Sequence, residues 1–474
     1  MQRTGVLVVG SRALNLVYVG ALAQVERRVP FWPLERTMRL QRRRIRTIVR
    51  YAYETVDFYR REMDERGLSP DKFHTAEDLE RLPLISAEDL ARSPMDFVSA
   101  PYRRAGREVF MTSGSTSGLR KPIFIDNRYI VRRIARSERD RCVVAKLSGE
   151  SWIGLLAREF LADQGARPLG RLFGLLTAGH NRLSIFPADF SSRTERGMWS
   201  EHSLIPRKAV HRHHLSPHAS FEEALRRLDE LRPRVVLSFG SYVDHFMRAL
   251  AASGRSAALP RVWVYMGDMI SPEARLLAEE RFGVQLYSVY GAMEAGSIGF
   301  QCELRDGFHL NIDLCALRLI DEQGQTVAPG QPGEVVVSAL DNRAMVLLNY
   351  RLGDWGTLQS SRCPCGRSLP VLARLEGRRS EVISLPSGQQ LSVLNLEGAF
   401  APELRQTLQA QLEQEAPGRL RWRIVPTEGA DRDALKNAFL ARAADKLGAD
   451  VELRIEFVDG IARTPQGKFK RVLS

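Results

Sequence analysis

Cysteine is scarce in this sequence, which has five thiols in 474 residues: Cys142, Cys302, Cys315, Cys363 and Cys365. A small secreted scaffold held by disulfides is dense in cysteine and usually has an even number of them. A sparse, odd set in a long chain excludes that class and favours a reducing compartment. We therefore expect a cytoplasmic protein.

Uninterrupted apolar runs are lacking as well. The most apolar N-terminal stretch, residues 6–25, is broken by Arg12 and Asn15, whereas a membrane-spanning helix needs about 20 mostly apolar residues. No clear small-residue cleavage site follows it, so a signal peptide is not indicated. We expect no integral membrane segment and a buried or peripheral helix at this position.

Acidic residues are fewer than basic ones, with 56 Asp and Glu against 69 Lys and Arg and a net charge of +13. Eleven of the arginines fall within residues 26–61, beside four acids. The apolar residues of 38–59 recur with a helical period, which puts arginines on the opposite face of an amphipathic helix. Because no nucleic-acid-reading motif accompanies this charge, we interpret the face as solvated and expect no nucleic-acid partner.

The remaining composition is that of an ordinary globular protein, with 44% hydrophobic and 26% charged residues. The length predicts roughly two to four domains, because single cores stop growing at about 250–300 residues. Short apolar runs at 235–237, 262–265 and 285–290 alternate with helical stretches at 221–231 and 272–282. This alternation is typical of an α/β protein with a layered sheet.

The pattern changes after residue 333. Strands expected at 334–338 and 345–350 indicate a β-rich subdomain. The tail predicts a small α+β domain from about residue 381, with a helix at 394–415, a strand at 420–425, a helix at 432–447 and a strand at 451–457. We expect an N-terminal domain at 1–376, a hinge at 377–380 and a mobile C-terminal domain at 381–474.

A loop rich in serine, threonine and glycine runs from Thr112 to Pro122 and includes Arg120 and Lys121. Glycines let backbone N–H groups approach a ligand, and hydroxyls and cations add donors and charge, so the loop predicts a phosphate-binding site. It lacks the Walker spacing, in which Gly-Lys is followed by Ser or Thr. Taken alone, this composition is also typical of a flexible surface loop.

Two later strands end in residues suited to a nucleotide. Tyr290 and Gly291 close an apolar strand shortly before Glu294, and a ring beside bare backbone can stack on a base while the carboxylate holds Mg²⁺. Asp354 follows Gly353 at the end of another strand, where it can accept ribose hydroxyls. Each sequence is also a common turn, so neither decides alone.

The order of the motifs is more informative than any one of them. With Gly377-Arg378 at the joint and Lys468 in the Arg-Thr-x-x-Gly-Lys tail, five motifs occur in the order found in the adenylate-forming superfamily, which the chain resembles from about residue 40 onward. Within it, the helix end at 57–60 and the turn at 78–83 are similar to the phenylacetate–CoA ligase-like branch, which includes capsular-polysaccharide-biosynthesis proteins.

The resemblance implies a large α/β domain, a mobile small domain and two half-reactions. A carboxylic acid, in this branch often aryl or aryl-acetic, attacks the α-phosphate of ATP in the presence of Mg²⁺, and coenzyme A then takes the acyl group after the small domain rotates. The resemblance assigns to the phosphates the loop residues Thr112, Ser113, Gly114, Ser115, Thr116, Gly118 and Lys121.

The resemblance also assigns the other site residues. Tyr290 and Gly291 correspond to the adenine site, and Asp354 and Arg378 to the ribose contacts. Glu294 is similar to the magnesium-binding acid, and Lys468 to the lysine that bridges carboxylate and α-phosphate. A cation in a closed site stabilises charge in the transition state more than in the ground state, so both are expected to be catalytic.

The sequence departs from the family pattern at three places. Ser117 is inserted in the loop before Gly118, Ser380 is the expected pivot of an unusual Arg-Ser-Glu hinge, and Asp268 stands after Gly267 where Gly-Glu is common. With Tyr242, Gly267 and Asp268 are expected to line the acid pocket.

Three functions stay open at this point. The chain is an acyl-CoA ligase, an acyl-AMP ligase that passes its product to an amine, a hydroxyl or a carrier protein, or a non-catalytic binding protein that works through its arginine-rich helix. The last is disfavoured because all five motifs keep chemically competent residues. The identity of the acid and the presence of a homodimer are not determined by the sequence.

Four soft metal ligands fall in two close pairs, Cys302 with His309 and Cys363 with Cys365. Three thiols and one imidazole form a tetrahedral zinc set, which predicts a structural Zn²⁺ site. The alternative is a group of ordinary reduced thiols beside a turn, because Cys-x-x-Cys is the more usual spacing.

Overall fold

The structure is a computed structural model of the 474-residue chain. It describes residues 18–104, 107–112, 120–149, 182–186, 212–378, 382–388, 390–448 and 450–473. The chain divides into two compact units. Unit 1 comprises residues 1–180, 189–212 and 288–375, and unit 2 comprises 181–188, 213–287 and 376–474.

The helices of unit 1 include the arginine-rich segment. The apolar face expected within 38–59 is buried in α2, but Val56 is extended and divides the helix into α2 and α3. The α-helices are α2 (Leu34–Thr55), α3 (Asp57–Glu65), α4 (Ala87–Arg92), α5 (Asn127–Arg136) and α6 (Glu138–Leu147). Short 3₁₀ turns cover Val29–Phe31, Pro70–Lys72, Glu77–Arg81, Pro94–Phe97 and Ala100–Tyr102.

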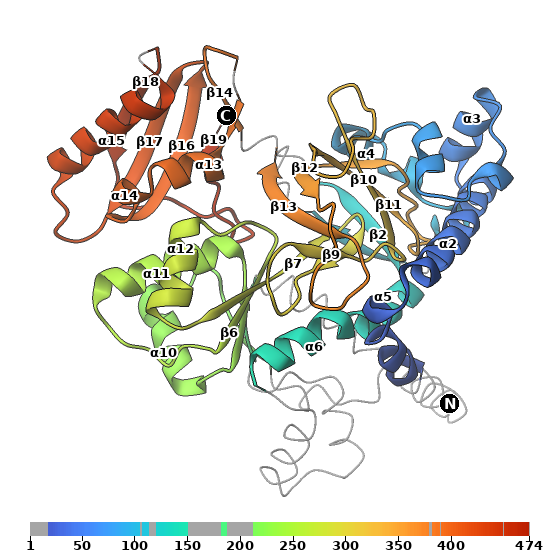
Figure 1. Ribbon diagram of the computed structural model, residues 1–474, viewed down its shortest axis with the longest axis horizontal. Coiled ribbons are helices and arrows are strands. Elements are labelled where there is room, and N and C mark those ends of the chain that lie inside the picture. Colours follow the sequence, from blue (N-terminus) through green and yellow to red (C-terminus); the bar gives the residue numbers. More distant parts are fainter. Residues whose placement is uncertain are drawn as a thin grey trace, which may run out of the picture. The chain divides into compact units, whose positions relative to one another are not determined.

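The strands of unit 1 form a sheet in the order β10-β11-β12-β13-β9-β8-β7 and a separate antiparallel pair, β1-β2. Their bounds are β1 (Arg107–Met111), β2 (Pro122–Asp126), β7 (Gln285–Ala292), β8 (Gly296–Phe300), β9 (Phe308–Leu310), β10 (Cys315–Ile320), β11 (Pro332–Ala339), β12 (Tyr350–Leu358) and β13 (Val371–Arg378). Figure 1 shows β9, β12 and β13 close together, with α2 along the margin of this unit. The β-rich character expected after residue 333 is present.

The expected strand at 345–350 is wrong. Residues 345–349 are buried, but only Met345 makes an isolated bridge, Asn349 takes a left-handed φ of +59°, and β12 begins at Tyr350. Side chains replace strand partners here: the Tyr59 hydroxyl accepts from the amide of Leu348 at 2.8 Å and donates to the carbonyl of Val346 at 3.2 Å. A periodic apolar pattern cannot distinguish such a segment from a strand.

Buried charges join distant segments of unit 1. The Arg139 guanidinium on α6 donates to Asp313 at 2.8 Å and to Glu26 at 2.8 Å. Arg44 on α2 donates to the same Asp313 carboxylate at 3.0 Å. Each of these buried carboxylates is therefore paired with a cation, as burial of a charge requires. Arg44 joins α2 to the interior of the unit, while the other arginines of α2 are exposed.

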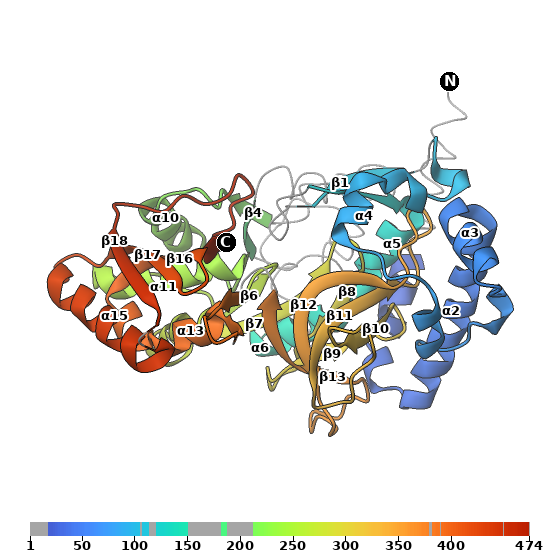
Figure 2. The same ribbon diagram turned by 90° about the horizontal axis from the view of Figure 1, so that it is seen from above.

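The first part of unit 2 has the expected α/β alternation, with β3, β5 and β6 parallel. Its elements are β3 (Arg182–Ile185), β4 (Arg212–Leu215), α10 (Phe221–Leu231), β5 (Val235–Ser238), α11 (Gly240–Ser253), β6 (Val262–Met266), α12 (Pro272–Leu276) and a π-helical turn at Leu277–Arg281. Figure 2 shows α10 and α11 in green, overlapping in that view with the red strands of the C-terminal part of the same unit. Large buried side chains such as Phe246 and Trp263 fill the core between helices and strands.

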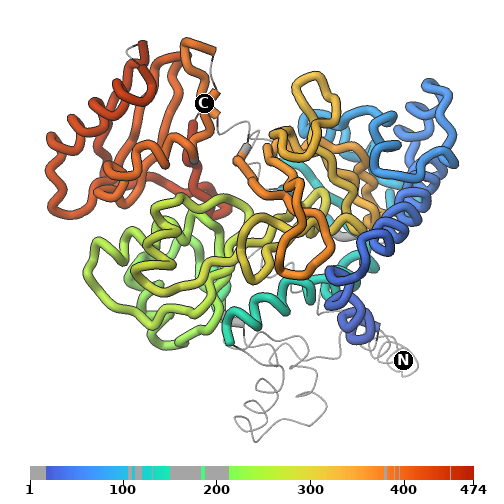
Figure 3. The backbone as a smooth tube through the Cα atoms, in the orientation of Figure 1, coloured from blue at the N-terminus to red at the C-terminus, as the bar shows by residue number. Residues whose placement is uncertain are grey.

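The C-terminal part of unit 2 is an α+β fold whose sheet has the order β18-β17-β16-β19. Its elements are β14 (Val382–Ser384), β15 (Gln390–Ser392), α13 (Val393–Ala399), α14 (Ala401–Leu404), β16 (Thr407–Ala416), β17 (Arg419–Pro426), α15 (Arg432–Leu447), β18 (Glu452–Phe457) and β19 (Val472–Leu473). Phe400, Trp422 and Phe439 pack in its core. Figure 3 traces this segment, orange to red, beside residues 213–287.

The helix expected at 394–415 is wrong in its second half. Helix α13 ends at Ala399 and α14 at Leu404, and residues 407–416 form β16 between β17 and β19. Glutamine, glutamate, leucine and alanine favour a helix locally, but the pairing with two neighbouring strands overrides that preference. The elements expected at 420–425, 432–447 and 451–457 are confirmed as β17, α15 and β18.

Among the residues that the structure describes, no helix combines the length and apolar character needed to cross a membrane.

Candidate active site

The two described ends of the Ser/Thr/Gly loop are held together. The Thr112 amide donates to the Lys121 carbonyl at 2.9 Å, and the Lys121 amide donates to the Thr112 hydroxyl at 2.9 Å. These bonds close the mouth of the hairpin between β1 and β2. The loop residues Ser113, Gly114, Ser115, Thr116 and Gly118 lie outside the described residues.

Side chains from three motifs meet beside this loop. The Lys121 ammonium lies 3.2 Å from the Glu294 carboxylate and donates to the Tyr350 hydroxyl at 2.9 Å. Tyr350 donates to Oε1 of Glu294 at 3.4 Å. The side chains of Lys121 and Glu294 are 9% and 10% exposed, so this charge pair lies almost entirely out of water.

The second pair of predicted nucleotide residues also meets. The Tyr290 hydroxyl donates to Oδ2 of Asp354 at 2.8 Å. Gly291 is required by the β7–β8 hairpin, because a Cβ there would lie 2.8 Å from the carbonyl oxygen of Gly296. Gly353 has a φ of +77°, which directs the chain into Asp354 through a conformation that favours glycine. The predicted adenine and ribose residues are therefore adjacent.

The residues of unit 1 fit Mg²⁺ and a polyphosphate chemically. Mg²⁺ is usually held by one or two carboxylates together with substrate phosphates. Glu294 offers a buried carboxylate whose Oε1 is engaged by Lys121 and Tyr350, and no hydrogen bond to its Oε2 is found within the described part of the chain. Lys121 supplies a cation at the end of the glycine-rich loop, where phosphate charge is expected.

Lys468 lies in unit 2, in a closed turn. Its amide bonds the Thr464 hydroxyl at 3.1 Å, and its carbonyl accepts from the Thr464 amide at 2.8 Å. Its ammonium donates to the carbonyl of Gly267 at 2.7 Å. Gly267 has a φ of +84°, and an added Cβ would lie 3.2 Å from the lysine Nζ. The structure therefore brings together two residues that the sequence assigned to catalysis and to the acid pocket.

The other predicted pocket residues lie near this contact. Tyr242 is buried on α11 beneath the guanidinium of Arg463, and burial raises the pKa of its hydroxyl to about 12. Asp268 accepts from the amide of Ser241 at 3.2 Å and from its hydroxyl at 2.6 Å. Asp268 is thus committed to the first turn of α11, while its part in binding an acid stays a prediction.

The hinge residues are only partly described. Strand β13 ends at Arg378, whose side chain is not described, and Ser380 lies outside the described residues. The ribose role of Arg378 and the pivot at Ser380 therefore stay predictions, as does the division into an N-terminal and a mobile C-terminal domain.

The four predicted metal ligands converge in unit 1. The ligand atoms of Cys302, His309, Cys363 and Cys365 all lie within 4.8 Å of one another. The Sγ atoms of Cys302 and Cys363 are 3.9 Å apart, and Sγ of Cys365 lies 3.2 Å from Nε2 of His309. Cys302 follows β8 and His309 lies on β9, which pairs with β13 through Val371. The β8–β9 and β12–β13 connections are thus brought to one point.

The imidazole and one thiol of this cluster have pKa values that suit a metal, whereas burial raises the pKa of Cys302 and raises that of Cys363 to about 12. Burial lowers the pKa of His309 to about 4, with a further contribution from the charge of Arg367, so the imidazole is neutral at pH 7. Burial alone would raise the pKa of Cys365, but hydrogen bonds from Arg367 outweigh it and lower that pKa. A neutral imidazole and a stabilised thiolate are the forms that bind zinc.

Sequence reasoning missed several side chains of the site. Tyr350 heads the Tyr-x-x-Gly-Asp motif and could have been identified from it. Ser241 stands beside Tyr242 in a segment that the sequence already assigns to the acid pocket, but its contacts could not be predicted. Asp244 sits in a helix without a distinguishing pattern, and Arg471 follows the tail lysine as one arginine among many, so for these two residues the sequence holds no local signal.

Comparisons with known proteins agree with this architecture. The family model for the CapK C-terminal domain matches residues 384–474. A phenylacetate-coenzyme A ligase of Thermus thermophilus is 27% identical over 74% of this chain and 72% of its own length. That of Aromatoleum evansii is 23% identical over 92% of this chain and 93% of its own length.

Solved structures show the same fold. A 2-hydroxyisobutyryl-CoA ligase in its postadenylation state, bound to an acyl-AMP, covers 94% of this chain and 91% of that one, with a TM-score of 0.69 and 19% identity. In its thioesterification state the same ligase gives a TM-score of 0.55 at the same coverage. The predicted resemblance is confirmed: the chain has the fold of the adenylate-forming enzymes and is similar to phenylacetate-coenzyme A ligases.

Proposed function

We propose that this protein is an adenylate-forming acid–thiol ligase. It activates a carboxylic acid with ATP to give an acyl-adenylate and pyrophosphate, and then passes the acyl group to the thiol of coenzyme A. The similarity to phenylacetate-coenzyme A ligases over most of their length supports both half-reactions and favours an aryl or aryl-acetic acid.

The observation that carries the proposal is the meeting of Lys121, Glu294 and Tyr350. They come from three motifs, the outer two of which are 229 residues apart, yet their charged and hydroxyl groups lie within 3.4 Å of one another in a site almost closed to water. A buried lysine–glutamate pair is weak support for stability, since desolvation offsets its attraction. A role in binding Mg·ATP would explain why the pair is buried.

The residues take the following parts. Glu294 would hold Mg²⁺, which when bound neutralises charge on the ATP phosphates. Lys121 binds phosphate oxygens, Tyr290 packs against the base, and Asp354 accepts the ribose hydroxyls. Lys468 brings its ammonium to the reacting carboxylate and α-phosphate and stabilises the charge that develops there.

The test is ATP–pyrophosphate exchange with a panel of aryl, aryl-acetic and short aliphatic acids, followed by thioester formation with coenzyme A. Exchange that depends on one class of acid, and thioester formation only when coenzyme A is added, are the expected results. Exchange with acyl transfer to an amine or a carrier protein instead of coenzyme A would favour the acyl-AMP ligase alternative. No exchange with any acid would contradict the proposal.

We also assign the cluster of Cys302, His309, Cys363 and Cys365 to a structural Zn²⁺. Zinc–sulfur bonds of about 2.3 Å in a tetrahedron place two sulfurs about 3.8 Å apart, and the Sγ atoms of Cys302 and Cys363 are 3.9 Å apart. The cluster joins the β8–β9 connection to the β12–β13 connection, and β12 and β13 bear Asp354 and Arg378, so the metal would stabilise the ends of those two strands. All five cysteines are free thiols, which supports the proposal of a cytoplasmic location.

A further inference from the structure

The tail that bears Lys468 is fastened to α11 on both sides of the lysine. On one side Arg463 lies over the ring of Tyr242, 5.2 Å from its centroid. On the other side Phe469 and Arg471 bind the first two turns of the helix. Both segments belong to unit 2, so the contacts are part of one compact body.

The first fastening runs through Ser241. The amide of Phe469 donates to the Ser241 hydroxyl at 3.2 Å, and that hydroxyl donates to Asp268 at 2.6 Å. Gly240 permits this approach, because a Cβ there would lie 2.6 Å from the Asp268 carbonyl oxygen. The backbone of Phe469 is thus linked through Ser241 to Asp268. The neighbouring Gly267 carbonyl accepts from the ammonium of Lys468, so both contacts involve the same segment.

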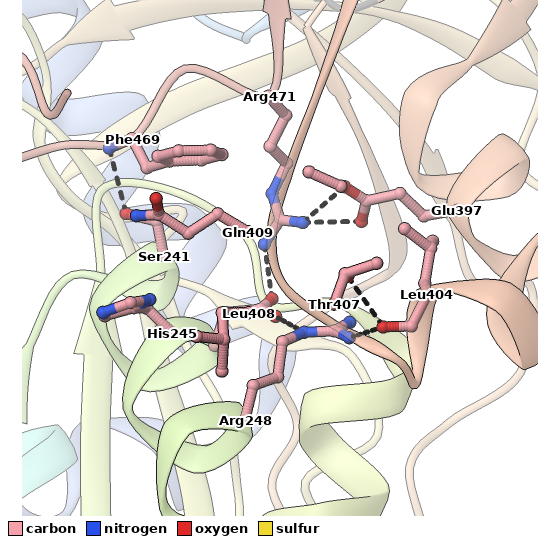
Figure 4. Close-up of a pocket in the computed structure, with 12 residues that line it drawn as sticks. Ser241, His245, Arg248, Glu397, Leu404, Thr407, Leu408, Gln409, Phe469 and Arg471 are labelled. Carbon is pink, nitrogen blue, oxygen red and sulfur yellow. Dashed lines mark hydrogen bonds and ion pairs between the residues drawn. The ribbon is translucent and has the colours of Figure 1, made fainter. Parts of the chain in front are cut away.

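The second fastening is a buried charge cluster around Asp244 (Figure 4). Arg471 donates to Asp244 at 2.6 Å and to Glu397 at 2.7 Å. Arg248 donates to the same Asp244 at 3.0 Å and to the Leu404 carbonyl at 2.6 Å. Burial raises the pKa of Asp244, but the charges of Arg471 and Arg248 outweigh burial and hold it below its ordinary value.

These contacts constrain the lysine more than its own turn does. The turn from Thr464 to Lys468 is closed by its own hydrogen bonds, and Gly467 is pressed against Pro217, where a Cβ would lie 2.3 Å from the ring. A closed turn fixes the shape of the tail but not its place on α11. That place is set by the groups on either side, which bind the backbone of Phe469 and the guanidinium of Arg471.

We infer that Ser241 and Asp244 are positioning residues that hold Lys468 in place for acid activation. The inference rests on the proposed function. Asp244 does not contact Lys468 itself; it acts through Arg471. Misplacing a reacting cation by about 1 Å can cost roughly 10²-fold in rate. Acyl transfer from a preformed adenylate does not use the lysine in the proposed mechanism, so loss of either contact should impair the first half-reaction selectively.

The experiment compares Ser241→Ala and Asp244→Asn with a control made at another contact within unit 2. Arg405→Gln removes an ion pair between Arg405 and Glu273 at 3.0 Å whose arginine is 60% exposed. The control removes a contact between α12 and the C-terminal part of unit 2 and leaves the contacts of Ser241 and Asp244 with the tail unchanged. Three quantities are measured for each protein. They are the kinetics of ATP–pyrophosphate exchange, acyl transfer from supplied acyl-adenylate, and the rate at which an amine-reactive acetylating reagent modifies Lys468 relative to exposed Lys436.

In Ser241→Ala and Asp244→Asn we expect kcat for exchange to fall at least tenfold with KM for ATP little changed. Acyl transfer should stay within about twofold of wild type, Lys468 should be acetylated several-fold faster, and Arg405→Gln should match wild type throughout. Equal losses in both half-reactions, or unchanged exchange, would overturn the inference. If the wild type shows no exchange with any acid, the proposed function fails, and the acetylation rates alone still decide whether these residues seat the lysine.

Discussion

The buried pair of Lys121 and Glu294 allows a quantitative test of the site. Replacing Lys121 by methionine keeps an unbranched side chain that is one atom shorter, but removes the cation. Among the residues that the structure describes, Glu294 would then retain only the hydroxyl of Tyr350 at 3.4 Å in a nearly closed environment. Breaking one partner of a buried ion pair costs about 3–5 kcal/mol, because an uncompensated charge is left behind.

That cost converts to a thermal shift. For folding units of about 150–250 residues, 1 kcal/mol corresponds to about 2–4 °C in the midpoint; unit 1 is larger, so the low end of that range applies and Lys121→Met should lower the midpoint by about 6–10 °C. The double variant Lys121→Met with Glu294→Met removes both charges and should recover much of the loss. The control Arg50→Met breaks the exposed pair with Asp71 in the same unit and should cost less than about 1 kcal/mol.

Scanning fluorimetry and pyrophosphate exchange are measured for four variants: Lys121→Met, Glu294→Met, the double variant and Arg50→Met. We expect the loss in the double variant to be smaller than the sum of the single losses by at least about 1 kcal/mol, with exchange activity absent even where stability returns. Additive losses within about 0.5 kcal/mol would mean that the two residues do not interact in solution, and would refute the geometry on which the proposed site rests.

Three further predictions follow from single contacts. Lys468→Ala should lower the rate of adenylate formation by about 10²–10³ while acyl transfer from supplied adenylate survives, and equal losses in both steps would contradict its assignment. Protein purified without chelator should contain close to one zinc per chain by elemental analysis, and Cys363→Ser should lose the metal and melt at a lower temperature; a metal-free wild type would contradict the site. Burial raises the pKa of Asp313, but the Arg139 charge outweighs it and lowers that pKa to about 2. The carboxylate therefore contributes roughly 2 kcal/mol above pH 4 that is lost as the pH falls towards 2. Asp313→Asn should weaken this dependence of the thermal midpoint on pH, and an unchanged profile would rule the residue out as its source.

The parts of the fold that the sequence predicts well are those with a local cause. Helix α15 and strands β17 and β18 have clear periodicity and lie where the pattern places them. The segment at 407–416 was read as a helix because its glutamines and glutamates favour one, and only its pairing with β17 and β19 makes it a strand. Long-range pairing has no signature within the segment itself.

The candidate site divides in the same way. Tyr290, Glu294, Asp354 and Lys468 stand in short motifs, so the sequence alone could nominate them. It could not show that Lys121 would be buried against Glu294, because their contact depends on how β2 and the turn after β7 are packed. The contacts of Ser241 and Asp244 with the tail could not be predicted either, since Phe469 and Arg471 lie more than two hundred positions away.

The hydroxyl of Tyr59 has a consequence for how this protein can vary over evolution. It both donates to and accepts from the backbone of the buried segment before Tyr350, where a neighbouring strand would otherwise supply those bonds. A phenylalanine there would leave a buried amide and a buried carbonyl without partners, at about 1–3 kcal/mol each. Position 59 and the segment at 346–348 therefore cannot drift independently. A relative that lacks this hydroxyl should carry a regular strand or another polar side chain in its place, so the aromatic helix end reports on the scaffold and not on the choice of acid.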